Sequence, residues 1–369
     1  MSEKLHIGVI FGGRSGEHEV SLVSAASVIA ALDRSKYEII PIGITPEGRW
    51  ISSPRALELL REQRADDEPE RFLLPRPGRH DLNNGGRQES KIDVVFPLVH
   101  GTHGEDGTLQ GLLELADVPY VGAGVIGSAL GMDKILQKKL FAAAGLPIAE
   151  YVWFLSSQFR EKPKRVVKAV EESLAYPVFV KPANTGSSVG ISKAHDKGEL
   201  MEALELAAKF DRKIIVEKGI RKVREIEISV LGNDNPVASV AGEVVPSNEF
   251  YDYDAKYVDG KSTVIIPADL PRKIVKELQE FAVRAFTSLD CCGMARVDFF
   301  VTRKNRIYLN EINTIPGFTS ISMYPKLWEA SGLKYADLLD RLIGLAQERH
   351  RERAAVSHRY NPTREWYKG

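Results

Sequence analysis

Short apolar runs alternate with helical patterns over the first third of the chain. The pattern predicts strands at Leu5–Phe11, Tyr37–Ile44 and Ile92–Val99, and a helix that ends near Leu32. Strands that alternate with helices favour a parallel sheet covered on both faces, with functional loops at the carboxyl ends of the strands. We therefore expect a doubly wound α/β unit at the N-terminus.

Residues 52–91 interrupt this unit. They are rich in charged residues, Pro and Gly. Such a composition buries little apolar surface, so we expect a solvated insertion, partly helical near Pro54–Arg61 and poorly ordered around Arg76–Gln88. After it, the pattern predicts a helix at Thr108–Ala116 and a short strand at Pro119–Val121.

Beyond Gly122 the elements follow a different order. One long helix is predicted at Ile126–Ala144, because Gly145-Leu-Pro147 gives a stop signal. Further strands are predicted at Ala149–Phe154, Val178–Lys181, Gly190–Lys193, Lys213–Glu217, Glu225–Leu231 and Val237–Val245. Further helices are predicted at Lys164–Leu174, Lys197–Phe210, Arg272–Leu289, Ile321–Ala330 and Tyr335–Arg353.

Two apolar runs near the end of this region, Met294–Thr302 and Ile307–Thr314, are separated by a polar turn. If Lys304-Asn305 is a two-residue hairpin turn, Asp298 lies opposite Glu311, and Arg296 lies opposite Asn313. The period of two places all four side chains on one face of the hairpin. A register slip of one residue would undo this arrangement.

Opposed carboxylates repel each other, so this hairpin needs a cation between Asp298 and Glu311. Carboxylate and amide oxygens are hard ligands that suit Mg²⁺ shared with substrate phosphates. The alternative is an acidic sheet edge that faces solvent. The apolar neighbours on both faces favour a covered hairpin and hence the metal site.

Composition and charge narrow the function classes. A chain of 369 residues is expected to form two or three domains, and its formal net charge of +0 gives no electrostatic case for nucleic acid or for a membrane surface. No apolar run approaches the ~20 residues of a membrane helix. The only cysteines, Cys291 and Cys292, are adjacent, which favours a reducing cytoplasm.

Two glycine-rich stretches are candidates for phosphate binding. Gly122-Ala-Gly-Val-Ile-Gly127 has the spacing of a dinucleotide motif but lacks an acidic residue ~20 positions later, so we favour glycines that ease a chain crossing. Asn184-Thr-Gly-Ser-Ser-Val-Gly190 lies between two strand-like runs and follows Lys181. Its backbone N–H groups suit phosphate oxygens, although alone it is also typical of a mobile turn.

Several motifs occur in a fixed order along the chain. They are Met132-Asp-Lys134, Val180-Lys181-Pro182, Gly186-Ser-Ser188, Glu217-Lys218, Arg224-Glu225, Arg296-Val-Asp298 and Asn310-Glu-Ile-Asn313. This series resembles the ATP-grasp ligases. Four further stretches resemble the D-alanine–D-alanine ligases in particular: Gly12–Ser21, His100–Gly107, Phe250–Tyr257 and Asn313–Ser320. The similarity extends from about Lys4 to Ala346.

The resemblance implies an α/β fold, α+β in its later part. It consists of an N-terminal doubly wound domain, residues 1–122 with the 52–91 insertion, followed by two ATP-grasp domains, 123–216 and 217–355, and a tail, 356–369. It also implies ATP-dependent ligation of two D-alanines through a D-alanyl phosphate, with two Mg²⁺ or Mn²⁺ and K⁺ as a further candidate. A cytoplasmic homodimer is expected.

Roles follow from the resemblance residue by residue. ATP is expected to contact Lys134, Lys181, Ser187, Ser188, Glu217, Lys218, Ile220, Glu225, Asn310 and Glu311. Metal ions are expected at Asp298, Glu311 and Asn313. Catalysis is expected to involve a Glu17–Ser187–Tyr257 triad, Arg296 and the Gly317 N–H, and substrate to contact His100, Lys256, Ser320 and Ser322.

Three alternatives remain at this stage. The first is a D-alanine–D-lactate ligase or another ATP-grasp carboxylate–amine ligase. The second is an NAD(P)-dependent oxidoreductase built on the Gly122–Gly127 motif. The third is a nucleotide-binding regulatory protein without turnover. The loop that ends in Lys256-Tyr257 resembles that of the peptide-forming ligases and favours D-alanine as the second substrate.

Overall fold

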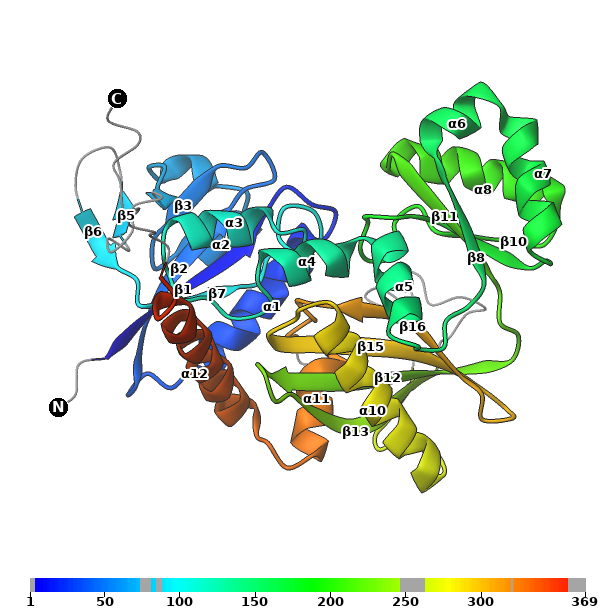
Figure 1. Ribbon diagram of the computed structural model, residues 1–369. Coiled ribbons are helices and arrows are strands. Elements are labelled where there is room, and N and C mark those ends of the chain that lie inside the picture. The colour runs from blue at the N-terminus through cyan, green and yellow to red at the C-terminus, as the bar shows by residue number, and fades with distance from the viewer. Residues whose placement is uncertain (1–3, 74–80, 84–87, 246–262, 320, 358–369) are drawn as a thin grey trace, which may run out of the picture.

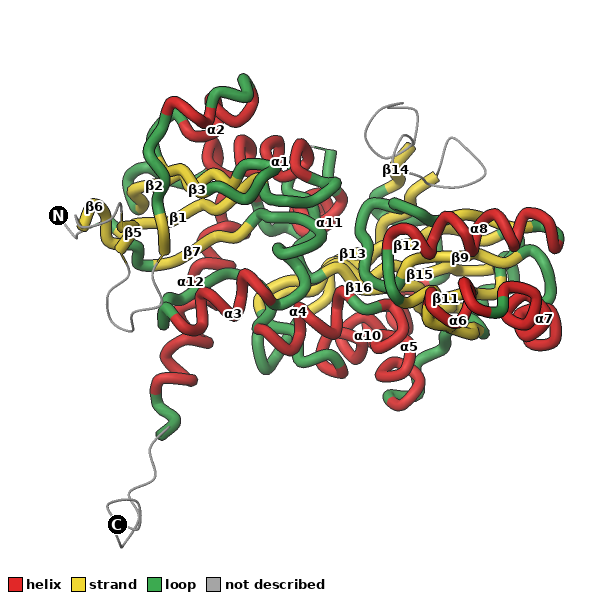
Figure 2. The backbone as a smooth tube through the Cα atoms, turned by 90° about the horizontal axis from the view of Figure 1, so that it is seen from above, coloured by secondary structure: helices red, strands yellow, loops and turns green. Residues whose placement is uncertain are grey.

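The structure is a computed structural model that describes residues 4–73, 81–83, 88–245, 263–319 and 321–357 (Figure 1). An N-terminal sheet occupies one end of the molecule, and two antiparallel sheets lie at the other end (Figure 2). None of the described helices is both long enough and apolar enough to cross a membrane.

The N-terminal sheet has the order β3-β2-β1-β7. Strands β1 (Leu5–Gly12), β2 (Tyr37–Ile44) and β7 (Val94–Pro97) are parallel, and β3 (Trp50–Ser52) is antiparallel to β2. Helices α1 (His18–Ala31) and α12 (Tyr335–Ala354) pack with one face of the sheet, and α3 (Thr108–Leu115) packs with the other. The predicted doubly wound arrangement is confirmed.

The insertion contains more regular structure than we predicted. Helix α2 (Ala56–Arg61) was expected. A short 3₁₀ helix (Ala65–Asp67) and an antiparallel sheet follow it, with strands β4 (Phe72–Leu73), β5 (Asp81–Asn83) and β6 (Gln88–Lys91). Strands this short carry no readable periodicity. The predicted strand at 119–121 is reduced to one parallel bridge between Tyr120 and Val95, with backbone hydrogen bonds from Val95 N to Pro119 O and from Val121 N to Val95 O.

The predicted helix 126–144 is two helices, α4 (Val125–Met132) and α5 (Lys134–Ala143). Asp133 adopts φ −86° and ψ 101°, and its side chain accepts hydrogen bonds from the backbone N–H groups of Ile135 and Leu136. An aspartate that caps a helix satisfies donors that have no partner within the helix. The apolar pattern runs through the break, so only the cap reveals it.

A central sheet has the order β10-β9-β11-β8 and is antiparallel. Its strands are β8 (Tyr151–Leu155), β9 (Val178–Pro182), β10 (Ser192–Ala194) and β11 (Lys213–Lys218). Helices α6 (Ser156–Glu161), α7 (Pro163–Ser173) and α8 (Lys197–Phe210) share an apolar core with it. The sheet has its own core and leaves β9 and β11 open to the neighbouring sheet.

The C-terminal sheet has the order β14-β13-β12-β15-β16. Its strands are β12 (Val223–Gly232), β13 (Val237–Val245), β14 (Thr263–Ile265), β15 (Gly293–Thr302) and β16 (Ile307–Asn313). Helix α10 (Arg272–Ser288) packs on one face, where Ile226, Ile228 and Val297 are buried, and α11 (Met323–Ala330) packs near β13. The alternate residues of β12 and β15 therefore face away from α10.

The hairpin of β15 and β16 has the predicted register at the site but not the predicted turn. Thr302 N donates to Arg306 O, so three residues form the loop, and Asn305 adopts φ 58°. This loop shifts the register by one residue. A bulge beyond Asp298 leaves Asn310 without an opposite residue and restores the pairing of Asp298 with Glu311.

Gly122 and Gly127 allow the chain to pack closely against the segment around Asp290 and Gly293. Gly122 has φ 96°, and a Cβ added at Gly293 would lie 3.0 Å from Gly122 N. A Cβ at Gly127 would lie 2.7 Å from Asp290 O. This agrees with our interpretation that these glycines ease a chain crossing.

Candidate active site

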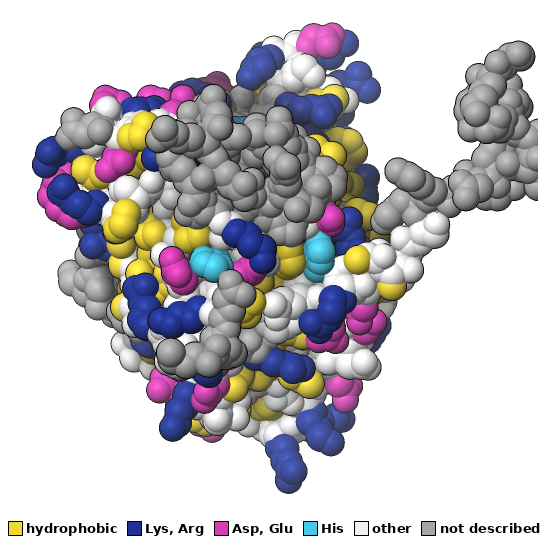
Figure 3. Space-filling view, turned by 90° about the vertical axis from the view of Figure 1, so that its left-hand side faces the viewer, with side chains coloured by type: hydrophobic (Ala, Val, Ile, Leu, Met, Phe, Trp, Pro, Cys, Tyr) yellow, Lys and Arg dark blue, Asp and Glu magenta, His cyan; other side chains and the backbone are white. Residues whose placement is uncertain are grey.

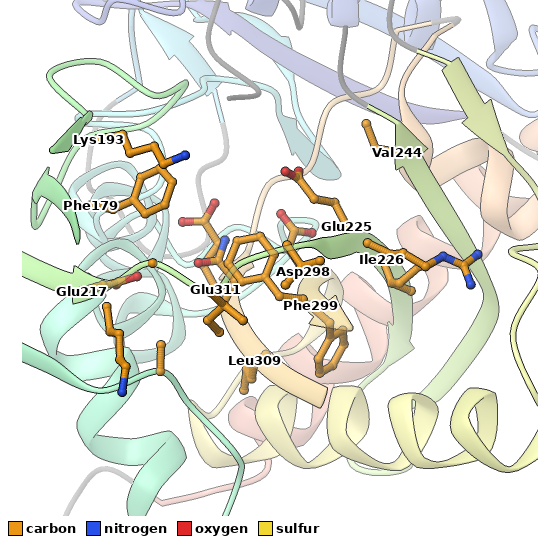
Figure 4. Close-up of a pocket in the computed structure, with 18 of the residues that line it drawn as sticks. Phe179, Lys193, Glu217, Glu225, Ile226, Val244, Asp298, Phe299, Leu309 and Glu311 are labelled. Carbon is orange, nitrogen blue, oxygen red and sulfur yellow. The ribbon is translucent and has the colours of Figure 1, made fainter. Parts of the chain in front are cut away.

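Three carboxylates form a row across neighbouring strands of the C-terminal sheet. Glu227 on β12 pairs in register with Asp298 on β15, and Asp298 pairs with Glu311 on β16. Figure 4 shows Asp298, Glu311 and also Glu225 directed toward the same space. Since the predicted pair has a third acidic neighbour, the site is more acidic than the hairpin alone indicates.

Arg296 is the basic partner of this row. Its Nε and Nη2 donate to Asp298 Oδ1 and Oδ2, each at 2.7 Å, and Glu227 Oε2 lies 3.0 Å from Nε. Burial opposes the charge of Arg296, but Asp298 and Glu227 raise its pKa well above the ordinary value. Asn313 Nδ2 also donates to Asp298, at 3.1 Å. Arg296 therefore balances the charge of Asp298 and Glu227 in this row.

A buried cluster of lysines lies beside the row. Lys181 Nζ is 3.0 Å from Glu217 Oε2 and 3.4 Å from Asn310 Oδ1. Lys138 Nζ is 3.3 Å from Glu217 Oε1. Burial would raise the pKa of Glu217, but the two lysines outweigh it and lower that pKa. Lys134 Nζ donates to the Thr185 carbonyl and lies 3.6 Å from Glu311. Three buried lysines and the carboxylate of Glu217 therefore form one charged cluster beside the row.

A cavity of about 620 Å³ lies between the central and C-terminal sheets. The cavity has an apolar side, which includes Phe179, Ile226, Val244, Phe299 and Leu309 (Figure 4). The other lining residues include Lys181, Ser188, Glu217, Lys218, Ile220, Glu225, Asn310 and Glu311. The apolar part suits an aromatic base, and the lysine end suits phosphates. The expected ATP residues thus gather at one cavity, except Lys134 and Ser187, which lie outside its lining.

Glu17 and Ser187 meet although 170 positions separate them in the sequence. Ser187 Oγ donates to Glu17 Oε1, and Glu17 is buried. Ser187 and Ser188 have φ values of 44° and 61°, in the left-handed region. The glycines beside this contact leave room for the carboxylate: a Cβ at Gly101 would lie 2.6 Å from Glu17 Oε2, and one at Gly186 would collide with it.

His100 is buried and lies close enough to Glu17 to interact with its charge. Its Nδ1 lies 3.2 Å from the Ile315 carbonyl, so Nδ1 carries the proton, and Nε2 accepts from Ser24 Oγ at 3.1 Å. Burial lowers the pKa of His100 even though Glu17 opposes this shift. Both ring nitrogens contact protein atoms. In this structure His100 therefore supports the loop that follows β16.

Glu105 connects the loop at Gly101 with the loop that follows β16. Its carboxylate accepts hydrogen bonds from Gly101 N at 2.7 Å and Ile315 N at 3.2 Å. Burial, followed by the charge of Glu17, raises the Glu105 pKa to about 8. The loop after Ile315 leads to Gly317, and a Cβ there would lie 2.7 Å from Ser322 Oγ. Lys256, Tyr257 and Ser320 lie outside the described residues.

Family models described as D-ala D-ala ligase N-terminus and C-terminus match residues 6–123 and 140–344. The chain belongs to the D-alanine–D-alanine ligase family.

Relatives and solved structures agree with the family models. A D-alanine–D-alanine ligase of Acetivibrio thermocellus is 49% identical over 95% of this chain and 98% of its own length. A D-alanine–D-alanine ligase of Thermoanaerobacter pseudethanolicus is 52% identical over 95% of this chain and 99% of its own length. The ligase structure from Coxiella burnetii is 40% identical, with a TM-score of 0.84 over 96% of this chain and 97% of that one. The structure of the VanG D-Ala:D-Ser ligase of Enterococcus faecalis is 39% identical, with a TM-score of 0.83 over 93% of this chain and 100% of that one.

Several residues of the site were missed by the sequence analysis. Lys138 lies one helical turn after Lys134 on α5, a spacing that indicates a shared face. Phe179 precedes Lys181 by two on β9, and Glu227 follows Glu225 by two on β12, so the strand period would have placed them in the site. Lys193 and His195 also line the cavity. Lys193 lies on the short strand β10 and His195 follows it, and neither belongs to a motif that pointed to the site.

Whether a metal ion fits the hairpin depends on the donor atoms that the hairpin offers. Among the described residues, no group of three or more His, Cys, Asp or Glu side chains is arranged to hold a metal. Asp298, Glu311 and Asn313 nevertheless carry hard oxygen atoms on one hairpin, beside a lysine cluster that suits phosphates. Mg²⁺ uses few protein ligands and shares its site with substrate phosphates, so these residues fit it.

We expect Gly186→Ala to hold the Ser187 loop away from Glu17, because the added methyl group would collide with Glu17 Oε2. The KM for D-alanine should rise roughly tenfold or more, as expected for the loss of one buried charged contact. Steady-state kinetics at saturating ATP would measure it. Gly344→Ala is the control, since a Cβ there meets nothing within 4 Å. A Gly186→Ala enzyme with a normal KM would show that the contact between the Ser187 loop and Glu17 does not govern D-alanine binding.

Proposed function

We propose that the chain ligates two D-alanines to D-alanyl-D-alanine, with ATP as co-substrate, for peptidoglycan precursor synthesis. The observation that carries the proposal is the Ser187–Glu17 contact, which joins the loop beside the nucleotide cavity to a buried carboxylate of the N-terminal unit. That carboxylate suits an ammonium group, and membership of the D-alanine–D-alanine ligase family makes D-alanine the amine that we propose for it.

The reaction must overcome the poor electrophilicity of a carboxylate. A carboxylate oxygen of the first D-alanine attacks the γ-phosphorus of ATP, ADP leaves, and an acyl phosphate results. The free amine of the second D-alanine attacks the acyl carbon. The tetrahedral intermediate then expels phosphate and loses the amine proton. The protein contributes positioning and stabilisation of negative charge.

Lysine side chains and the β15–β16 hairpin would bind the phosphate groups of ATP. Lys134 and Lys181 lie at the acidic row and would act as point charges toward phosphate oxygens. Ser187 and Ser188, in left-handed conformation, would offer backbone N–H groups. Glu217, Lys218, Ile220, Glu225, Asn310 and Glu311 would line the nucleotide. The ion pairs of Glu217 with two lysines indicate that it orients Lys138 and Lys181 as well.

Asp298, Glu311 and Asn313 would hold two Mg²⁺ or Mn²⁺ ions. When bound, such ions neutralise the charge that develops on transferring phosphoryl groups. K⁺ remains a candidate for an additional activating ion.

The amino-acid substrates would lie at the junction of the N-terminal unit and the hairpin. Glu17 would receive the ammonium group of the first D-alanine, supported by Ser187, and His100 would orient the surrounding loops. Arg296 and the Gly317 N–H would stabilise the oxyanion. Ser322 would bind the carboxylate of the second D-alanine. Lys256, Tyr257 and Ser320, which lie outside the described residues, would complete these sites.

We also propose three domains that meet near residues 122 and 216. The central sheet has a core of its own, whereas the core of the N-terminal sheet also includes Leu231, Met294 and residues of α12. We propose a homodimer, as the family resemblance implies. A cytoplasmic location is supported by the two free cysteines. On the face that Figure 3 shows, basic and acidic side chains are interspersed, which agrees with small molecules rather than nucleic acid as partners.

The test is a product assay on the full chain with ATP and Mg²⁺. Isotope-labelled D-alanine should give the labelled dipeptide, ADP and phosphate in equal amounts. Parallel reactions with D-lactate or D-serine as competing nucleophile should leave D-alanyl-D-alanine as the main product near neutral pH. A preference for D-lactate there would refute the assignment of the second substrate, and hydrolysis of ATP without any ligated product would refute the ligase.

A further inference from the structure

Both carboxylate oxygens of Asp298 are occupied by protein donors. Arg296 Nε bonds to Oδ1, whereas Oδ2 accepts from Arg296 Nη2 and Asn313 Nδ2. A guanidinium and a divalent cation compete for the same lone pairs, because each neutralises the carboxylate. These three donors leave about one lone-pair site of the carboxylate, and a metal ion placed there would repel the guanidinium, so we expect Arg296 to give up at least one contact when a metal binds.

Arg296 has a second acidic partner that does not belong to the hairpin. Glu227 is buried on β12, directly across from Asp298, and its Oε2 is 3.0 Å from Arg296 Nε. The Arg296 side chain is partly buried, with 20% of its surface exposed, so water solvates its charge only in part. A charge in such a place is destabilised when it loses its carboxylate partner. Glu227 can hold Arg296 in place when Asp298 is taken by another cation.

We propose that Glu227 is a positioning residue that retains Arg296 when Asp298 exchanges the guanidinium for a metal ion. This inference rests on the proposed metal role of Asp298. Without metal, Arg296 neutralises Asp298. With metal, Arg296 pairs with Glu227 and stays beside the reacting carboxyl group, where the proposed oxyanion forms. One arginine thus serves both states of the site.

An alternative is that Glu227 acts on the metal ion directly, through its own negative charge. The two differ in whether Arg296 is needed. If Glu227 acts through Arg296, removing the arginine abolishes the effect of Glu227 on metal binding. If Glu227 acts directly, its effect persists without the arginine. A double-mutant cycle separates the two cases.

The experiment measures Mn²⁺ binding by electron paramagnetic resonance, with ADP present, for the wild type, Glu227→Gln, Arg296→Gln and the double variant. Glu227→Gln should weaken Mn²⁺ binding about tenfold, since Arg296 then has only Asp298 to pair with. Arg296→Gln should bind Mn²⁺ at least as tightly as the wild type. The double variant should match Arg296→Gln within about twofold.

Glu243→Gln is the matched control. Glu243 is buried on β13 and pairs with Arg224 at 2.6 Å, so this variant breaks another arginine–carboxylate pair of the same sheet. It should bind Mn²⁺ as the wild type does. Normal Mn²⁺ affinity in Glu227→Gln would overturn the inference, and so would a tenfold loss that persists in the Arg296→Gln background. A wild type that binds no Mn²⁺ would instead refute the metal role itself.

A second measurement needs no variant in the working enzyme and covers the case in which a variant fails to fold. The ¹⁵N resonance of the Arg296 Nε–H group, assigned with Arg296→Lys, is followed while Mg²⁺ is added to wild-type protein with ADP. It should shift with Mg²⁺ and remain protected from solvent exchange, as expected for a guanidinium that changes its carboxylate partner. An unchanged resonance would show that Arg296 does not leave Asp298, and a loss of protection would show that Glu227 does not retain it.

Discussion

Asp298→Asn and Glu311→Gln are each expected to lower turnover by about 10²-fold or more, the range seen when one preorganised charge-stabilising group is lost. The two side chains face each other on β15 and β16 and offer the carboxylate oxygens that Mg²⁺ prefers. Each variant should also need a higher Mg²⁺ concentration for half-maximal rate. The measurement is initial rate against free Mg²⁺ at saturating ATP and D-alanine.

The control for this pair is Glu280→Gln, which removes the same charge from the exposed side of α10, on the opposite face of the sheet. Its Mg²⁺ dependence should match that of the wild type. Circular dichroism would verify that all variants keep the fold. If Asp298→Asn and Glu311→Gln both keep the wild-type Mg²⁺ dependence, the hairpin is not the metal site.

The pairing within the β15–β16 hairpin was predicted correctly, although the turn that we used to predict it was incorrect. Asp298 lies opposite Glu311, and Arg296 lies opposite Asn313, as expected. A three-residue loop and a bulge at Asn310 shift the register in opposite directions and cancel at the site. Periodicity gives the face of each residue, but a bulge depends on pairing that a single strand pattern does not carry.

Long elements with strong periodicity were predicted well. Strands β2 and β13 and helix α8 have the bounds that the pattern gave. Breaks inside an apolar pattern were missed, as at Asp133, where the capping side chain overrides the periodicity. Short strands of two to four residues, such as β4–β6, were missed as well, because they contain too few alternations to be recognised.

The site shows the same division between local pattern and tertiary contact. The chemistry of Lys181, Glu225 and Asp298 was readable from strand position. The contact between Glu17 and Ser187 was implied only by the family resemblance, since no local rule joins residues 170 positions apart. Lys138 is a buried charge and Glu105 is a half-buried carboxyl group, and both have partners on other elements. Sequence patterns give no distances between elements, so such partners stay hidden.

We expect Glu17→Gln to raise the KM for the first D-alanine about 100-fold, with a smaller change in the KM for ATP. Glu17 is buried and is the carboxylate that we propose for the substrate ammonium group. Loss of a charge-assisted contact at a buried site is worth about 3 kcal/mol, which corresponds to roughly two orders of magnitude in affinity. Steady-state kinetics with D-alanine as the varied substrate would measure this change.

Two further variants separate charge from loop closure. Ser187→Ala removes the hydroxyl that donates to Glu17 but keeps the carboxylate, so its KM for D-alanine should rise only about tenfold, the effect of one hydrogen bond to a charged group. Glu19→Gln removes an exposed carboxylate two residues along the chain and should leave the KM unchanged. An equal rise in Glu17→Gln and Ser187→Ala would indicate that Glu17 acts only by closing the loop. A normal KM in Glu17→Gln would place the ammonium group elsewhere, because a bound cation that loses its only carboxylate partner in a buried site cannot keep its affinity.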